Sequence, residues 1–177
     1  MVARAPRHDP RALAVWAALE EVADPEIPAI SVVELGVIGQ VAFEPRADGG
    51  ERLSVELLPT FVGCPAIDVM RQQIGERLLA LEIVDEVVVP LRFTPPWTSD
   101  RITPEGREKL RASGFAPPLL IGSAFDGAEL QLHIAQATCP YCGSRNTTLD
   151  NPFGPTLCRA IHHCEACHQP FEQFKAV

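Results

Sequence analysis

Two closely spaced cysteine pairs near the end of the chain constrain its fold more than any other feature. Cys139 and Cys142 form one C-x-x-C pair, Cys164 and Cys167 form a second, and 21 residues separate the two pairs. A two-residue spacer lets one tight turn present two sulfur atoms, and two facing turns complete a tetrahedral site. So short a segment buries too little apolar surface to fold unaided, whereas structural zinc contributes about 10–16 kcal/mol. We therefore expect residues 139–177 to form a zinc ribbon whose four thiolates leave the metal no open position.

Three alternatives to this zinc site remain open on the residues alone. Iron accepts the same four-thiolate geometry as zinc. Disulfides or free thiols are the second alternative, but five of the six cysteines cluster in this segment and the chain begins with no recognisable signal peptide, which favours metal in a reducing compartment. The third is the replacement of a cysteine ligand by one of the neighbouring side chains, Cys158, His162, His163 or His168.

Composition and charge narrow the class of protein. The net charge is −8, and residues 139–177 hold three basic and three acidic side chains. A nucleic-acid partner needs a basic surplus to replace phosphate counterions, so we expect no nucleic-acid binding. No apolar run reaches the roughly 18 residues of a membrane span, so we expect a cytoplasmic protein without a membrane partner.

The remainder of the chain reads as a small α+β domain. Apolar residues recur at helical spacing after two proline-containing helix starts, and they alternate with polar residues in the segments between. We expect a sandwich-type arrangement with a three- to four-stranded sheet, spanning residues 1–118, then a linker over 119–138 in which Leu130, Leu132 and Ile134 alternate like a short strand. These two helices begin at Asp9-Pro10 and Cys64-Pro65, and Thr103-Pro104-Glu105 is a cap signature that starts a third, short helix. The predicted strands are Val37–Phe43, Leu53–Leu58 and Val87–Phe93.

Two residues of this domain are candidates for chemistry. Cys64 directly precedes a predicted helix, where free backbone N–H groups and the helix dipole favour a thiolate, so its pKa is expected to be depressed. A lone cysteine is, however, more often a small buried apolar residue, and Asp24 before Pro25 is more often a turn residue. No triad of nucleophile, base and acid is readable, and no glycine-rich phosphate loop is present.

Several motifs resemble known families. Asp24-Pro25-Glu26-Ile27-Pro28, Val33-Glu34-Leu35-Gly36-Val37-Ile38 and Thr60-x-x-x-Cys64-Pro65 resemble the SufT-like iron–sulfur assembly domain. Cys139-Pro-Tyr-Cys142-Gly-Ser, Phe153-Gly154-Pro-Thr156-x-Cys158-Arg-Ala and Pro170-Phe171-x-x-Phe174-Lys175 resemble the PaaD family, whose members are encoded with phenylacetyl-CoA epoxidase. The resemblance spans nearly the whole chain.

The resemblance implies an accessory role in aerobic phenylacetate degradation, without catalysis by this chain. It implies help in delivering or inserting an iron–sulfur cluster into the iron–sulfur flavin reductase of the epoxidase. Cys64 would then be a transient ligand of the cluster or of iron, and Asp24 would lie near it. Since one cysteine cannot hold a cluster alone, either a homodimer or the client would supply the other ligands.

Three other functions compete with this interpretation. A structural subunit would dock on the oxygenase through the zinc ribbon, with Cys64 as inert packing. A transcription-factor-like ribbon would bind DNA, against which the neutral module and acidic body argue. An enzyme would use Cys64 as its nucleophile, but the sequence shows no general base for it.

Overall fold

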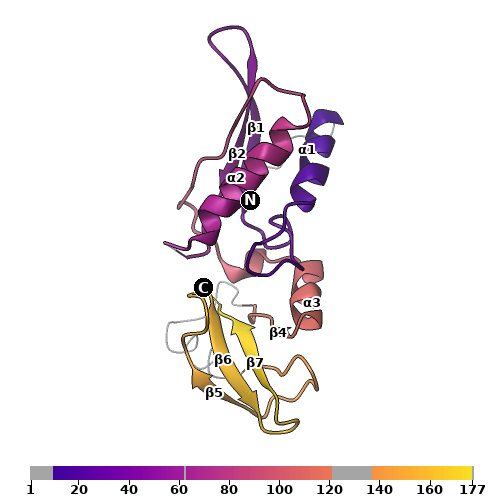
Figure 1. The fold of residues 1–177 in the computed structure, drawn as a ribbon, viewed down its shortest axis with the longest axis vertical. Helices are drawn as coiled ribbons and strands as arrows, with labels where there is room; N and C mark the ends of the chain where they lie inside the picture. The colour runs from indigo at the N-terminus through magenta and orange to yellow at the C-terminus, as the bar shows by residue number, and fades with distance from the viewer. Residues whose placement is uncertain (1–9, 62, 121–136, 177) are drawn as a thin grey trace. The chain divides into compact units, whose positions relative to one another are not determined.

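The computed structural model describes residues 10–61, 63–120 and 137–176 (Figure 1). Its contacts divide the chain into two compact units, with the division between Trp97 and Thr98. The first unit contains α1 (Pro10–Glu20), β1 (Ile38–Pro45), β2 (Glu51–Leu57), α2 (Ala66–Leu79) and β3 (Glu86–Val88). The second contains a 3-10 turn η1 (Ser99–Arg101), α3 (Pro104–Ala112), β4 (Phe115–Ala116), β5 (Thr147–Asn151), β6 (Arg159–Cys164) and β7 (Pro170–Phe174).

The sheet of the first unit has the order β1-β2-β3. β1 and β2 form the expected antiparallel hairpin, while β3 runs parallel to β2. The third strand was expected over Val87–Phe93, but β3 ends at Val88. Pro90 has no N–H to donate, so beyond it the pairing continues only as an isolated bridge between Leu57 and Leu91.

Two helices supply the apolar core that this sheet needs. α1 packs against α2, and α2 packs against β3. Along β2 the buried residues Leu53, Val55 and Leu57 alternate with partly exposed ones, so one face of the strand belongs to the core. Trp97 is buried, and its indole N–H donates to the backbone oxygen of Leu35 at 3.1 Å. The buried helical side chains are Ala12, Val15, Ala18 and Leu19 in α1, and Ala66, Ile67, Met70, Ile74 and Leu78 in α2.

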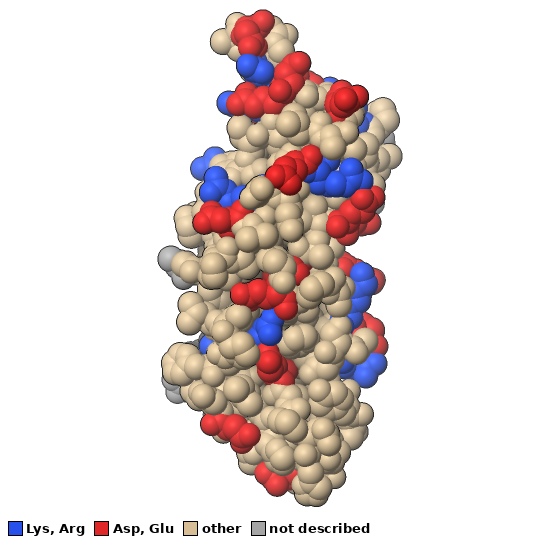
Figure 2. Space-filling model, in the orientation of Figure 1, with Lys and Arg blue, Asp and Glu red and all other residues tan. Residues whose placement is uncertain are grey.

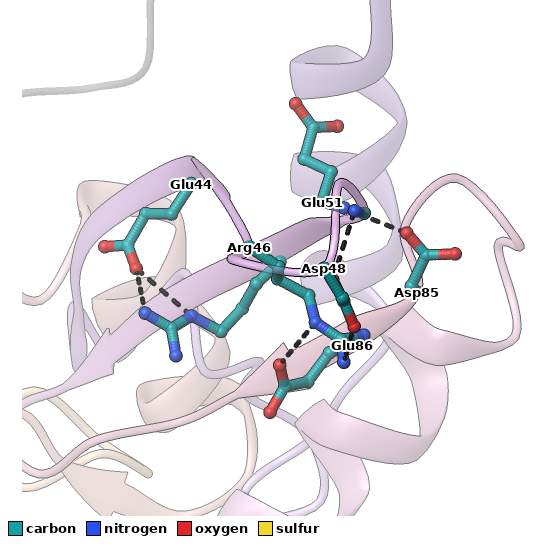
Figure 3. Close-up of polar contacts among 8 residues, drawn as sticks. Glu44, Arg46, Asp48, Glu51, Asp85 and Glu86 are labelled. Atoms are coloured by element: carbon teal, nitrogen blue, oxygen red, sulfur yellow. Dashed lines mark hydrogen bonds and ion pairs between the residues drawn. The ribbon is translucent and has the colours of Figure 1, made fainter.

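Ion pairs cover the hairpin formed by β1 and β2 (Figure 3). The Arg52 guanidinium lies 2.7 Å from a Glu44 carboxylate oxygen, and Arg46 lies 2.7 Å from Asp48 and 3.5 Å from Glu86. On the face drawn in Figure 2, basic and acidic side chains lie next to one another rather than in separate fields. Because water screens such exposed pairs, each contributes little to the stability of the fold.

The sheet of the second unit has the order β4-β7-β6-β5. β5, β6 and β7 are antiparallel, and the short β4 pairs in parallel with β7 through Phe115 and Ala116. Helix α3 directly precedes β4. Its N-cap, Thr103, accepts a hydrogen bond from the Gly106 N–H, as the sequence predicts. Arg107 adds hydrogen bonds from its guanidinium to the carbonyl oxygens of Ser99, Ile102 and Pro118.

The expected class is confirmed: an α+β unit with a three-stranded sheet and helices is followed by a small four-cysteine unit. Residues 98–118 make most of their contacts with the second unit, in part because β4 pairs with β7. The division between the two units therefore lies at Trp97, whereas the expected domain boundary lies at residue 118. The domain bounds 1–118, 119–138 and 139–177 stay a prediction. Residues 121–136 of the expected linker, including its short strand, lie outside the described residues. No described helix combines the length and the apolar character that crossing a bilayer requires.

The packing of α2 gives a direct test of this core. Ile74 is fully buried, so Ile74→Ala should lower the free energy of unfolding by about 2–5 kcal/mol through lost contacts and a cavity. Leu79, on the same helix, is 50% exposed, and Leu79→Ala should cost about 0.5 kcal/mol or less. Urea unfolding of the two variants measures both values, and equal losses would contradict the assigned buried face.

Candidate functional site

The structure brings the four cysteines of the two C-x-x-C pairs into one cluster. The sulfur atoms of Cys139, Cys142, Cys164 and Cys167 all lie within 4.8 Å of one another. The Cys139 and Cys167 sulfurs are 3.7 Å apart, and the Cys142 and Cys164 sulfurs are 3.6 Å apart. All four cysteines are free rather than paired in disulfides. The spacing in the sequence therefore predicted a real convergence of thiol groups.

Each pair sits on the same kind of tight turn. In the first, the Gly143 N–H donates to the Cys139 carbonyl at 2.9 Å, and Gly143 has a φ of 75°. In the second, His168 occupies the equivalent place, with a φ of 58° and an N–H that donates to the Cys164 carbonyl at 2.8 Å. Glycine adopts such a positive φ without cost, whereas histidine is strained there, so the second turn must be held by its surroundings.

Backbone donors in the second turn favour a thiolate. The N–H of Cys167, aided by that of Ala166, lowers the pKa of Cys164 to about 6, against the opposing effect of burial. Metals bind the thiolate and not the thiol, so the turn favours the ligand form at Cys164, whereas burial raises the pKa of Cys167 in the same turn to about 12.

The distances test whether the cluster suits a metal ion. Four sulfurs bound to one zinc at about 2.3 Å lie about 3.8 Å from each other in a tetrahedron. The two observed sulfur separations of 3.6 and 3.7 Å are close to that value. Two of the sulfurs also belong to an apolar cluster with Ala116, Ala137 and Phe171, which shields them from water. The four side chains thus fit a tetrahedral four-thiolate metal centre.

None of the neighbouring side chains that could have replaced a ligand joins this group. Cys158 is buried elsewhere, with its sulfur 3.1 Å from the Thr156 hydroxyl oxygen. His162 is fully buried, lies 3.0 Å from the Gln173 side-chain oxygen and stacks on Phe171, and burial lowers its pKa. The His163 and His168 rings lie near each other, 6.4 Å between centroids, outside the sulfur cluster.

Cys64 lies just before α2, at the place the sequence indicates, and is half-buried. Its pKa was expected to be depressed, and that expectation is wrong. Burial raises the pKa of the Cys64 thiol, and the carboxylates of Glu26 and Asp24 raise it further. The backbone N–H groups of Ala66 and Ile67 oppose this rise, as the helix start predicts, but they do not outweigh it.

Asp24 combines a turn role with proximity to Cys64. Its buried carboxylate accepts hydrogen bonds from the N–H groups of Glu26 at 2.7 Å and Ile27 at 2.9 Å. The Asp24 N–H itself donates to the Ile30 carbonyl at 2.9 Å, which closes the Pro-rich segment into a compact loop. The turn interpretation of Asp24 is thus correct in its hydrogen bonds, and its charge acts on the Cys64 thiol as well.

Glu26 is the residue that analysis of the sequence alone did not single out. It acts on Cys64 more strongly than Asp24 does, although it lies 38 positions away along the chain. The sequence feature that could have indicated Glu26 is its position between two prolines in Asp24-Pro25-Glu26-Ile27-Pro28, because prolines restrict the backbone of this loop. The loop sequence does not show that Cys64 is the group that Glu26 affects.

Two protein-family models match the chain. One, described as an iron–sulfur cluster assembly protein, matches residues 13–89. The other, described as the PaaD zinc β-ribbon domain, matches residues 126–175. The first match contains Asp24, Glu26 and Cys64, and the second contains all four clustered cysteines.

Three named relatives differ in how much of the chain they cover. A subunit of the "Putative 1,2-phenylacetyl-CoA epoxidase" of Escherichia coli K12 is 34% identical over 95% of this chain and 94% of its own length. The Fe-S protein maturation auxiliary factor YitW of Bacillus subtilis is 30% identical over 50% of this chain and 82% of its own length. A second auxiliary factor of that kind, from Porphyromonas gingivalis, is 33% identical over 52% of this chain and 83% of its own length.

A pair of conservative substitutions tests the sulfur cluster. Cys164→Ser should abolish metal binding and unfold β5–β7, because three thiolates hold the ion far more weakly than four. Cys158→Ser, in the same unit but outside the cluster, should keep one metal per chain. Elemental analysis and hydrogen exchange of β5–β7 measure the two effects, and retained metal in Cys164→Ser would contradict the assigned ligand set.

The raised pKa of Cys64 predicts its reactivity. An ordinary cysteine has a pKa of about 8.5, and only the thiolate is alkylated, so the iodoacetamide rate at Cys64 should inflect above that pH. Glu26→Gln removes a negative charge that raises this pKa, so it should shift the inflection to lower pH. Mass spectrometry of the Cys64 peptide follows the rate, and an inflection below about pH 8.5 in the unsubstituted chain would refute the predicted direction.

Proposed function

The chain belongs to the PaaD family of phenylacetyl-CoA epoxidase subunits, and from this premise we propose that it matures the epoxidase system by passing an iron–sulfur cluster to its flavin reductase. Its role is accessory to iron–sulfur assembly, as the names of its auxiliary-factor relatives support. The observation that carries the proposal is a half-buried Cys64 thiol influenced by the carboxylates of Glu26 and Asp24.

The surroundings of Cys64 suit a transient ligand better than a permanent one. With a raised pKa, the thiol keeps its proton at neutral pH, and a metal must displace that proton to bind. The same carboxylates that disfavour a lone thiolate attract a cation, so iron and thiolate stabilise each other there. Because a bound metal competes with a proton for the Cys64 sulfur, its binding there is readily reversed. Delivery to a client requires such reversible binding.

A single cysteine leaves most of a cluster's coordination positions to other molecules. Clusters are held by several thiolates, commonly four. The four ribbon cysteines converge on one another in the second unit, so we do not count them as ligands of the transferred iron–sulfur cluster. We therefore place the remaining ligands on a second copy of the chain or on the receiving reductase, with the iron–sulfur cluster as cargo.

We assign zinc to the four-cysteine site as a resident structural ion held by Cys139, Cys142, Cys164 and Cys167. Bound there, zinc supplies folding energy and no reaction chemistry, because four thiolates fill its coordination sphere. The chain's own part is to present the sulfurs on two tight turns and to cover Cys139 and Cys164 with apolar residues. In this proposal the ribbon is a folded unit held together by its metal and takes no part in cluster transfer.

The test compares reductase purified from cells that carry either the unsubstituted chain or Cys64→Ser. The variant should fold and keep its zinc, yet the reductase should lack most of its cluster iron and acid-labile sulfide. Cys158→Ser, which lies outside both sites, is the matched control and should leave reductase iron unchanged. Full cluster occupancy in the Cys64→Ser cells would overturn the proposal.

A further inference from the structure

The loop between β5 and β6 exposes an unusual amount of apolar surface. Phe153 is 66% exposed and Leu157 is 53% exposed, and Pro152 and Pro155 between β5 and β6 are exposed as well. We call these four side chains the 152–157 loop surface. Neither the sulfur cluster nor the Cys64 site uses them. Several large apolar side chains exposed within one short loop are candidates for contact with another molecule.

Hydrogen bonds hold this loop in one conformation. The Gly154 N–H donates to the Arg159 carbonyl at 2.9 Å. The Arg159 N–H in turn donates to the Thr156 carbonyl at 3.1 Å. The Phe153 N–H donates to the Asn151 side-chain oxygen at 2.9 Å. A methyl group added at Gly154 would lie 2.9 Å from the Arg159 Cβ, so the loop packs closely on the start of β6.

Lys175 fixes the Phe153 side of the loop. Its ammonium group donates to the Pro152 carbonyl at 3.2 Å and lies 5.4 Å from the centre of the Phe153 ring. A cation over an aromatic face is attracted to it, so the ring has a preferred place although it is exposed. An apolar side chain that is exposed and already positioned loses little freedom when a partner covers it.

The named relatives differ in how much of this chain they match. The iron–sulfur auxiliary factors match about half of this chain and more than four-fifths of their own length, whereas the epoxidase subunit matches nearly all of it. The names of the auxiliary factors agree with the iron–sulfur assembly model over residues 13–89, so among these three relatives we associate the ribbon, which contains the 152–157 loop surface, with the epoxidase subunit.

We infer that the 152–157 loop surface is the anchor by which this chain recognises one protein subunit of the epoxidase system, through an apolar pocket on that subunit. This inference rests on the proposed function, which supplies the class of partner. Four side chains are far fewer than the roughly 20–30 residues per side of a standard interface, so the loop is a small anchor within a transient contact. Such contacts concentrate their binding energy in a few large side chains, here Phe153 and Leu157.

The experiment measures binding of the full-length chain to each purified epoxidase subunit by biolayer interferometry. The double variant Phe153→Ala/Leu157→Ala should bind one subunit at least about tenfold more weakly, mainly through faster dissociation. Leu120→Ala is the matched control, since Leu120 is 65% exposed in the same unit but outside the loop, and it should bind normally. Zinc content and thermal unfolding of all variants should equal those of the unsubstituted chain. If the double variant fails to fold, Leu157→Lys, at an exposed position, provides the same comparison.

Equal affinity of the double variant for every subunit, or no binding of any subunit by the unsubstituted chain, would overturn the inference. So would a double variant that loses only self-association, because the loop would then join two copies of this chain. Cys64→Ser separates the two proposals: it should bind the subunit normally but leave reductase iron low. The loop variant should restore reductase iron once its concentration exceeds its higher Kd, so either proposal can fail without the other.

Discussion

The convergence of four sulfur atoms is the constraint on which the second unit depends. Cys139 and Cys164 are themselves buried members of its apolar cluster, beside Ala116, Ala137 and Phe171. The other members of this cluster, two alanines and one phenylalanine, bury little apolar surface around the sulfurs. A metal bound by the four thiolates would add stabilisation that apolar contact within the cluster does not supply. The position of β4 follows from the same centre, because Ala116 packs beside the sulfurs while it pairs with β7.

Features that depend on neighbouring residues could be predicted from the sequence, and those that depend on distant partners could not. Thr103 caps α3 and the two C-x-x-C turns present their sulfurs because each feature lies within five residues. The pairing of Phe115 with Glu172 joins segments 57 positions apart, and nothing near Phe115 specifies it. The end of β3 shows an intermediate case, in which Pro90 was visible but its effect depended on the parallel partner strand.

The candidate sites divide along the same line. Each C-x-x-C spacing brings two thiols together locally, and the convergence of the two distant pairs was predictable because a tetrahedral metal ion needs four ligands. The protonation of Cys64 was predicted in the wrong direction, because the local signal is the helix start, whereas burial and the charge of Glu26 come from tertiary structure. The backbone donors are present as expected, and their effect is simply smaller than that of desolvation. The pKa of a thiol such as Cys64 depends on which loop folds next to it and on the charges that this loop carries.

The thiols of the four-cysteine group do not share one protonation state. Backbone N–H groups lower the pKa of Cys164, whereas burial raises the pKa of Cys167 to about 12, so a metal that binds all four sulfurs must displace protons from some of them. At Cys64, burial and two carboxylates also raise the thiol pKa, so a ligand role there would likewise require loss of the thiol proton. The two proposed sites therefore differ in their number of ligands rather than in the protonation of any one thiol, because four sulfurs converge in the second unit and Cys64 is a single thiol in the first. Under the proposed function, loss of cargo at Cys64 would withdraw no ligand from the four-cysteine group, so the ribbon would stay folded.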